Sequence, residues 1–295
     1  MTSNPAAAPN VPQRATKRMM PLFVKLVLVV VGAFLFLRWF EYKQVYHPSS
    51  VWLTDQPAAG RSAQDVFLTT GDGVKIHCLF YAAAETSPRA GVVWCYFHGN
   101  GGNLSMRPLI LEALLSTGVN LLAVDYHGYG RSEGRPSERG TYRDAEAAYD
   151  WLIHRGFDPA RIIAHGESLG GGVASYLASA RRVGGLVIQS SYTTLPDIGR
   201  ERFPWLPVRL AGSIQYPTRE RLSGIRVPVM IMHSPSDQLM PFHHGQENFA
   251  AANEPKMFWT LNARHNDFVA SDGANYRAGL AAFLDRYFPC PPVVR

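Results

Sequence analysis

The feature that most constrains the fold is a regular alternation of short apolar runs with longer helix-like stretches between positions 61 and 289. Apolar runs that are separated by helical patterns are typical of a sheet covered by helices on both faces. We expect eight strands, over residues 65–69, 74–81, 91–97, 119–125, 161–165, 185–189, 227–233 and 256–261. Helices are expected over residues 104–116, 138–155, 169–180, 243–252 and 273–287. The sequence therefore predicts an α/β fold with a mostly parallel eight-stranded sheet.

Two segments depart from this alternation. The first two strands are joined by Thr70-Gly71-Asp72-Gly73, which is typical of a hairpin turn and predicts an antiparallel start to the sheet. Residues 190–224 are rich in proline and arginine, too long for a simple connection and too interrupted for one helix. We interpret this segment as a short helical cap over the carboxyl edge of the sheet, with a loose surface excursion as the alternative.

The N-terminal region predicts a membrane anchor. Residues 21–40 are apolar except for Lys25 and Arg38 near the ends, and as a helix they would be about 30 Å long, the thickness of a bilayer core. Long basic side chains at such positions can reach the interface. Residues 1–20 are expected to be a disordered tail, residues 41–60 a linker, and residues 61–289 the folded body.

Two alternatives to the anchor are a cleaved signal peptide and a buried core helix. The best cleavage site, Val31-Gly32-Ala33, lies inside a run that stays apolar, which argues against cleavage. Arg14, Lys17 and Arg18 precede the run, so the positive-inside rule predicts a cytoplasmic N-terminus and a body on the far side of the membrane.

The charge distribution excludes one class of partner. The chain has a net charge of +6, but residues 1–40 hold five basic residues and no acid, leaving 24 basic and 23 acidic side chains in the rest. A nearly neutral body does not supply the basic face that nucleic-acid binding requires. We therefore expect no nucleic-acid partner.

The chemistry of the chain centres on Gly166-Glu167-Ser168-Leu169-Gly170, which fits the pattern G-x-S-x-G. The pattern lies between a predicted strand and a predicted helix, where a sharp turn exposes the serine hydroxyl at the edge of a sheet. Ser168 is therefore the candidate nucleophile.

A nucleophilic serine needs a base, and the base needs a group that orients it. His265 and Asp237 each follow a late predicted strand, so both are expected at the carboxyl edge where ligands gather in open α/β sheets. We assign His265 as general base and acid, and Asp237 as the group that holds its tautomer. Asp125 and Asp267 are the alternative acids.

Two backbone amides are expected to stabilise a developing oxyanion: that of Leu169, after the nucleophile, and that of Asn100, in the glycine-rich loop after the third strand. The sequence has no H-E-x-x-H motif and no cysteine pair at ligand spacing, and His243 and His244 are adjacent rather than one turn apart. We expect neither a metal nor a cofactor.

These motifs resemble the α/β-hydrolase superfamily, and most of all its membrane-anchored serine hydrolases with a small cap. The resemblance runs from about Arg61 to Phe288 and includes the motifs His98-Gly99-Asn100, Asp125 to Ser132, Gly166 to Gly171, Ser236-Asp237 with Pro241, and His265 to Asp267. One departure is His233-Ser234, where relatives usually carry glycine after the strand.

The resemblance implies hydrolysis of an ester, thioester or similar acyl bond through an acyl-enzyme, without a cofactor. The expected partners are a small-molecule or lipid acyl ester and the membrane. Acyl transfer on the same residues, and a non-catalytic binding module with this fold, are the alternatives in function.

Overall fold

The central layer is one sheet of eight strands, as the alternation predicts. The structure, a computed structural model, describes residues 22–53, 60–206, 208 and 212–290. The strands of the sheet are β2 (Gln64–Thr69), β3 (Lys75–Tyr81), β4 (Val93–Phe97), β6 (Asn120–Val124), β7 (Ile162–Glu167), β8 (Gly185–Gln189), β9 (Val229–His233) and β10 (Lys256–Thr260). Their spatial order is β10-β9-β8-β7-β4-β6-β3-β2. Strands β2 and β3 form the antiparallel hairpin, β3 pairs antiparallel with β6, and the other pairs are parallel.

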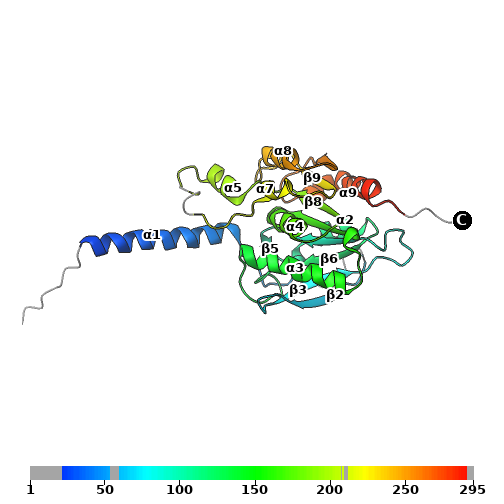
Figure 1. Cartoon of the computed structure of the whole chain (residues 1–295), viewed down its shortest axis with the longest axis horizontal. Helices are drawn as coiled ribbons and strands as arrows, with labels where there is room; N and C mark the ends of the chain where they lie inside the picture. The colour runs from blue at the N-terminus through cyan, green and yellow to red at the C-terminus, as the bar shows by residue number, and fades with distance from the viewer. Residues whose placement is uncertain (1–21, 54–59, 207, 209–211, 291–295) are drawn as a thin grey trace, which may run out of the picture.

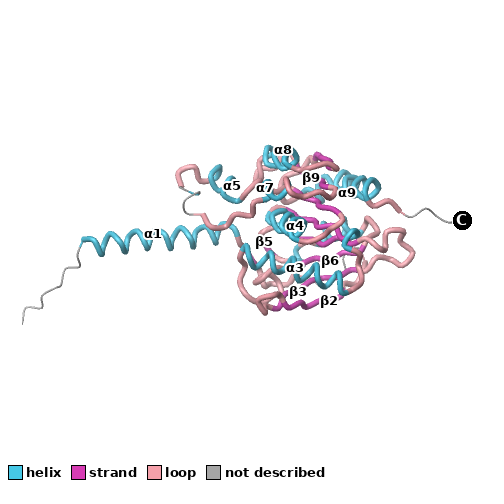
Figure 2. Tube along the Cα trace, in the orientation of Figure 1, coloured by secondary structure: helices cyan, strands magenta, loops and turns pink. Residues whose placement is uncertain are grey.

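Helices cover both faces of this sheet (Figures 1 and 2). The helices beside the sheet are α2 (Pro108–Leu115), α3 (Glu138–His154), α4 (Leu169–Ala180), α8 (Phe242–Ala251) and α9 (Phe268–Tyr287), with 3₁₀ turns η1 (Leu104–Met106) and η2 (Pro159–Arg161). Side chains alternate along each strand between two layers. In β4, Cys95 joins the core under α3 and α4, whereas Trp94 and Tyr96 join the core under α2 and α9. The predicted α/β class is confirmed.

The described part of the predicted cap segment, residues 190–224, includes two short helices. They are α5 (Leu195–Arg202) and α7 (Thr218–Leu222), and α7 packs against α4 and α8. Thr194 caps α5, because its side chain accepts a hydrogen bond from the backbone of Asp197. Residues 207 and 209–211 of this segment lie outside the described residues.

The N-terminal helix is longer than the sequence indicates. Helix α1 (Leu22–Val45) is exposed over residues 22–36, and it is long and apolar enough to cross a membrane. Its last turns meet the body (Figure 1). The next residue, Tyr46, is buried, and β1 (His47–Pro48) pairs with β5 (Gly101–Gly102).

These contacts change the interpretation of residues 41–60, which we expected to form a linker. Residues 41–45 continue α1, and residues 46–48 are fixed by the buried Tyr46 and by the β1–β5 pairing, because packing and hydrogen bonds there outweigh the turn-forming residues His47-Pro48. Residues 54–59, and the expected tail over residues 1–20, lie outside the described residues.

Candidate active site

The turn between β7 and α4 carries Ser168 in a strained backbone conformation. Ser168 has φ 51° and ψ −113°, a region that residues with a side chain rarely adopt. The two glycines of the motif make the turn possible. A Cβ on Gly166 would lie 2.0 Å from the carbonyl oxygen of Gly170, and a Cβ on Gly170 would lie 2.0 Å from that of Phe97. Strand β7, helix α4 and strand β4 therefore approach one another as closely as the motif predicts.

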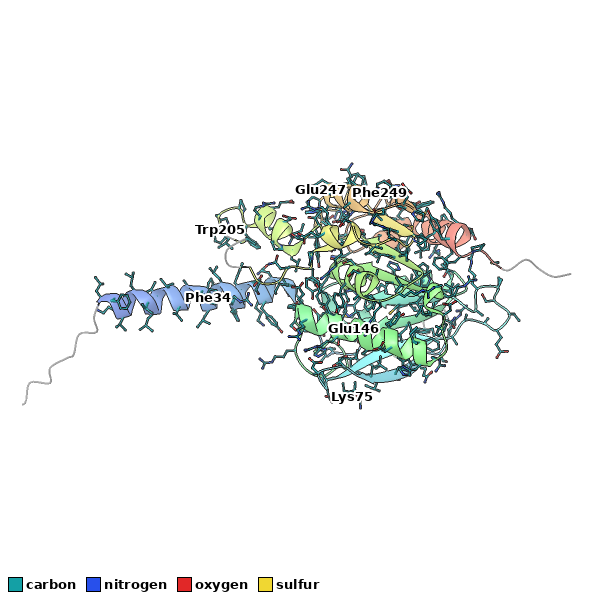
Figure 3. The ribbon with its side chains drawn as sticks, in the orientation of Figure 1. Phe34, Lys75, Glu146, Trp205, Glu247 and Phe249 are labelled. Carbon is teal, nitrogen blue, oxygen red and sulfur yellow. The ribbon has the colours of Figure 1, made fainter. Side chains whose placement is uncertain are left out.

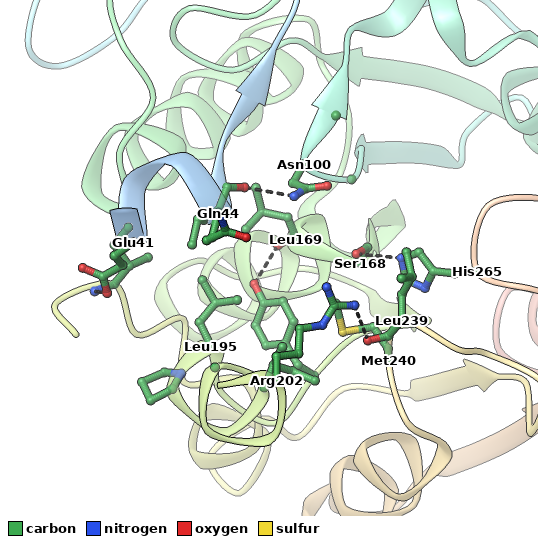
Figure 4. A pocket seen from close by; sticks show the side chains of 18 of the residues that line it. Glu41, Gln44, Asn100, Ser168, Leu169, Leu195, Arg202, Leu239, Met240 and His265 are labelled. Carbon is green, nitrogen blue, oxygen red and sulfur yellow. Dashed lines mark hydrogen bonds between the residues drawn. The ribbon is translucent and has the colours of Figure 1, made fainter. Parts of the chain in front are cut away.

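The structure brings the three residues of the predicted triad together. His265 Nε2 lies 3.1 Å from Ser168 Oγ, and His265 Nδ1 lies 2.7 Å from Asp237 Oδ2. All three side chains are buried. Asp237 follows β9 and His265 follows β10, so both reach Ser168 from loops at the carboxyl edge of the sheet (Figure 4 shows the Ser168–His265 contact). The arrangement has the hydrogen bonds that an activated serine requires.

Asp237 is held in its charged form. Burial alone would raise the pKa of this carboxyl, but His265 and the backbone N–H groups of Met240 and Leu239 lower it below its ordinary value. Those two amides donate to Asp237 Oδ1, at 2.8 Å and 2.9 Å. Oδ2 is left to accept from the imidazole, which fixes the tautomer with a proton on Nδ1. The acid loop thus holds Asp237 in place with Ser234 rather than glycine after β9.

The two alternative acids lie elsewhere. Asp125 Oδ1 is 3.1 Å from His98 Nε2 and also accepts from the backbone N–H of Leu104, so this buried carboxyl ties the β6 loop to the β4 loop. Asp267 precedes α9, and its Oδ1 is buried without a hydrogen-bond partner among the described residues. Geometry therefore favours Asp237 as the acid that contacts His265.

The loop after β4 is fixed against Ser168. A Cβ on Gly99 would lie 3.5 Å from Ser168 Cβ, so the loop passes directly beside the serine. The Asn100 carbonyl accepts hydrogen bonds from His47 N–H and Tyr129 O–H, and the Asn100 side chain donates to Val45 O at 3.1 Å. Leu169 is the first residue of α4, where backbone N–H groups lack partners within the helix. Asn100 and Leu169 line the same cavity as Ser168 and His265.

Sequence reasoning missed a partly buried ion pair behind Ser168. Glu167 accepts a hydrogen bond from Tyr96 O–H, and its Oε1 lies 3.9 Å from Arg107 Nη1. Burial would raise the pKa of Glu167, but Arg107 and the Tyr96 hydrogen bond hold it below its ordinary value. Arg107 also donates to Gly101 O at 2.6 Å and so joins the end of β7 to the loop after β4. The sequence signal for this ion pair was Glu167 itself. An acid inside a motif that is expected to be buried needs a partner for its charge.

Sequence reasoning also missed the wall that α1 contributes. A cavity of about 470 Å³ opens in front of Ser168. Its lining includes Leu37, Phe40, Glu41, Gln44 and Val45 from the last turns of α1. Figure 4 shows Glu41 and Gln44 of this set. The cap supplies the facing side, and the cavity volume is in the range of small-molecule sites.

One group of side chains has the composition of a metal site. Glu201 at the end of α5 and His243 and His244 in α8 offer three ligand atoms that all lie within 4.8 Å of one another. Glu201 Oε1 is 3.1 Å from His243 Nε2 and 3.4 Å from His244 Nε2. The sequence does not indicate this group, because the two histidines are adjacent and the carboxylate comes from a separate helix. In the structure it joins the cap helix α5 to α8.

Comparison with known proteins identifies the family to which this chain belongs. Residues 95–214 match the family model described as the alpha/beta hydrolase fold. The uncharacterized protein Rv2307c of Mycobacterium tuberculosis is 34% identical over 269 residues, which are 90% of this chain and 95% of that protein. The chain belongs to the α/β-hydrolase family.

Individual relatives and solved structures agree with this class. The human alpha/beta hydrolase domain-containing protein 17B is 31% identical over 213 residues, 70% of this chain and 71% of that protein. The esterase Pf2001 of Pyrococcus furiosus superposes with a TM-score of 0.68 at 21% identity, over 83% of this chain and 98% of that one. The esterase domain of a Rhodothermus marinus protein superposes at 0.59 with 22% identity, over 77% and 99%. At these identities the structural likeness shows the fold.

Proposed function

We propose that this hydrolase-family protein is a serine hydrolase that cleaves carboxylic esters or thioesters through an acyl-enzyme on Ser168. The observation that carries the proposal is the unbroken hydrogen-bond chain from Asp237 through His265 to Ser168, at 2.7 Å and 3.1 Å. A strained turn that presents the serine to the cavity supports the same role.

In the first half of the reaction, His265 Nε2 takes the proton of Ser168 while Oγ attacks the carbonyl carbon of the substrate. The negative charge that develops on the carbonyl oxygen is stabilised by the backbone N–H groups of Leu169 and Asn100. The bond to the leaving group then breaks, and His265 gives its proton to the departing alkoxide or thiolate. Asp237 stabilises the imidazolium that exists between these steps.

In the second half, water replaces the leaving group. His265 takes a proton from water, whose oxygen attacks the acyl carbon, and the bond from that carbon to Ser168 Oγ breaks. The proton returns to Oγ, and a carboxylic acid leaves. The products are the acid and the alcohol or thiol, so no cofactor is needed.

The experiment that tests this function is covalent labelling. A fluorophosphonate probe reacts with a serine only when a base and an oxyanion site activate it. We expect one adduct, mapped by peptide mass spectrometry to the peptide that contains Ser168, and loss of ester hydrolysis in step with labelling. Absence of labelling in folded protein, or an adduct on another serine with hydrolysis intact, contradicts the proposal.

We propose further that α1 is a retained membrane anchor with its N-terminus in the cytoplasm. The helix is exposed over the residues that would face lipid, and its last turn is bound to the body, as Asn100 Nδ2 donates to Val45 O. Basic residues before the helix set the orientation. Cys290 is exposed whereas Cys78 and Cys95 are buried. A membrane-impermeant maleimide should therefore label Cys290 in intact spheroplasts, and labelling only after lysis would contradict this topology.

A further inference from the structure

One wall of the cavity in front of Ser168 is formed partly by α1. Leu37, Phe40 and Gln44 are spaced three or four residues apart, so they lie on one face of the helix. All three line the cavity that contains Ser168 and His265, and Figure 4 shows Gln44 at this cavity. A segment that acts only as a tether would end before the cavity begins. Here the same helix is long enough for the membrane and reaches the candidate nucleophile's cavity.

Hydrogen bonds fix this end of α1 to the cap and to the loop after β4. The Glu41 carboxylate accepts from the backbone N–H groups of Ser213 and Ile214, at 2.8 Å and 3.0 Å. One residue past the helix, the hydroxyls of Tyr46 and Tyr216 lie 3.0 Å apart. The last turns of α1 are therefore part of the folded body, and where the helix leaves the body the cavity wall continues directly into the apolar span.

The cap places aromatic side chains beside the last turns of α1. The rings of Phe40 and Phe203 meet edge to face with centroids 5.4 Å apart, and Phe203 lies 6.3 Å from Trp205. Trp205 is 74% exposed, and Figure 3 shows it at the cap's tip, on the side from which α1 extends. Trp39 of α1 is exposed as well. Tryptophans at one level beside an apolar span are typical of the membrane interface.

Most of the cavity lining at this end is apolar. From the cap it includes Leu195, Ile198, Phe203, Leu206 and Val208. The charged side chains beside them have partners: Glu41 binds the cap backbone, and Arg202 Nη2 donates to Leu239 O at 3.1 Å. An apolar groove that ends at a nucleophile fits a hydrocarbon chain joined to a carbonyl group.

We propose that the last turns of α1 and the cap tip form an acyl-chain site that opens into the lipid leaflet, and that the substrate is a fatty-acyl ester lipid of that leaflet. The inference rests on the proposed serine hydrolase. The acyl chain enters between Phe40 and the cap, which brings its carbonyl carbon to Ser168. Trp205 and Trp39 hold the entrance at the depth where ester groups lie.

The first test uses full-length wild-type protein in phosphatidylcholine nanodiscs. We expect kcat/KM for p-nitrophenyl dodecanoate, which partitions into the bilayer, to exceed that for p-nitrophenyl butyrate by about tenfold or more, because each added methylene gains contact with an apolar site. A preference for butyrate overturns the acyl-chain site while leaving the hydrolase intact. Loss of both activities together with fluorophosphonate labelling would instead contradict the proposed function.

The second test removes one side of the groove. Phe40→Ala should lower the dodecanoate-to-butyrate ratio at least about fivefold, and Phe40→Leu, which keeps an apolar wall, should restore most of it. Phe34→Ala is the matched control, because Phe34 lies on α1 but does not line the cavity. If Phe40→Ala does not fold, Leu37→Ser carries the same comparison. An unchanged ratio in the folded variant, or an equal change in Phe34→Ala, overturns the role of α1.

A third test separates lipid from soluble substrates. Trp205→Ser should reduce the hydrolysis of 1,2-dioleoylglycerol in nanodiscs more than that of p-nitrophenyl butyrate, because only the lipid must enter through the membrane interface. Equal effects on the two substrates, or no hydrolysis of the lipid by wild-type protein that hydrolyses butyrate, would exclude a leaflet lipid ester as the substrate.

Discussion

His265 Nε2 lies 3.1 Å from Ser168 Oγ although 97 positions separate the two residues in the chain. The contact joins the loop after β10 to the turn after β7, and two strands of the order β10-β9-β8-β7 lie between them. Such a contact depends on the whole sheet being formed. The chemistry proposed for this protein is therefore a property of its tertiary structure rather than of any one motif.

The first prediction distinguishes Asp237, which contacts His265 in space, from Asp267, which is close to His265 in the sequence. Asp237→Asn keeps the shape of the side chain but presents the wrong partner to His265 Nδ1, so kcat should fall about 10⁴-fold. Asp267→Asn is the matched control, and kcat should stay within about threefold of wild type because His265 pairs with Asp237. Steady-state ester hydrolysis measures both, and a larger loss in Asp267→Asn would reassign the acid.

The second prediction concerns the pH dependence of the rate. The base must be neutral to accept a proton, so kcat/KM should rise with pH over the range in which histidines titrate, about pH 5 to 8. His265 and the loop amides lower the pKa of Asp237 against the effect of burial, so this carboxylate stays charged across that range. We therefore expect no second change in the pH–rate profile from Asp237. A flat profile for wild-type protein would argue against histidine as the base.

The third prediction links a buried histidine to acid stability. Burial lowers the pKa of His165 from 6.5 to about 4. Between these values the unfolded chain binds a proton that the folded chain does not, so folding stability is lost as the pH falls below 6.5. From pH 7 to pH 5 this loss is about 2 kcal/mol from this residue. His165→Gln should lose less stability over that interval than wild type in denaturant unfolding, whereas the exposed His154→Gln should match wild type.

The fourth prediction concerns the ion pair behind Ser168. Arg107→Met removes the cation facing the buried Glu167 carboxylate, so the free energy of unfolding should fall by about 3 kcal/mol. Adding Glu167→Gln removes the uncompensated charge and should recover part of that loss, since the amide can still accept from Tyr96. Unfolding of the single and double variants measures this coupling. Additive losses would mean that the two groups do not interact.

The sheet and the contact of Ser168, His265 and Asp237 could be predicted because both leave local signals. Eight apolar runs separated by helical patterns are a repeated pattern, and G-x-S-x-G at a strand–helix boundary sets the position of Ser168. Chain order then placed Asp237 and His265 after later strands, where the carboxyl ends of parallel strands meet. Each step needed only residue type and spacing.

The cavity wall could not be predicted in the same way. Leu37 and Phe40 belong to an apolar run whose composition indicates a membrane span, and nothing in their spacing indicates a second contact with the cap. Glu41 was the available signal, because an acid at the end of such a run needs donors, which the backbone of Ser213 and Ile214 supplies. The partner of Glu167 was hidden for a similar reason, since Arg107 lies 60 positions away in a loop.

The central claim, that Ser168 is the nucleophile, is tested most directly by hydrolysis of p-nitrophenyl butyrate by Ser168→Ala in detergent micelles. Ser179→Ala is the matched control, because Ser179 is an exposed residue of the same helix, α4. We expect Ser168→Ala to lose at least about 10³-fold in kcat with an unchanged melting temperature, and Ser179→Ala to retain the wild-type rate. A folded Ser168→Ala protein that hydrolyses the ester at the wild-type rate would contradict the account.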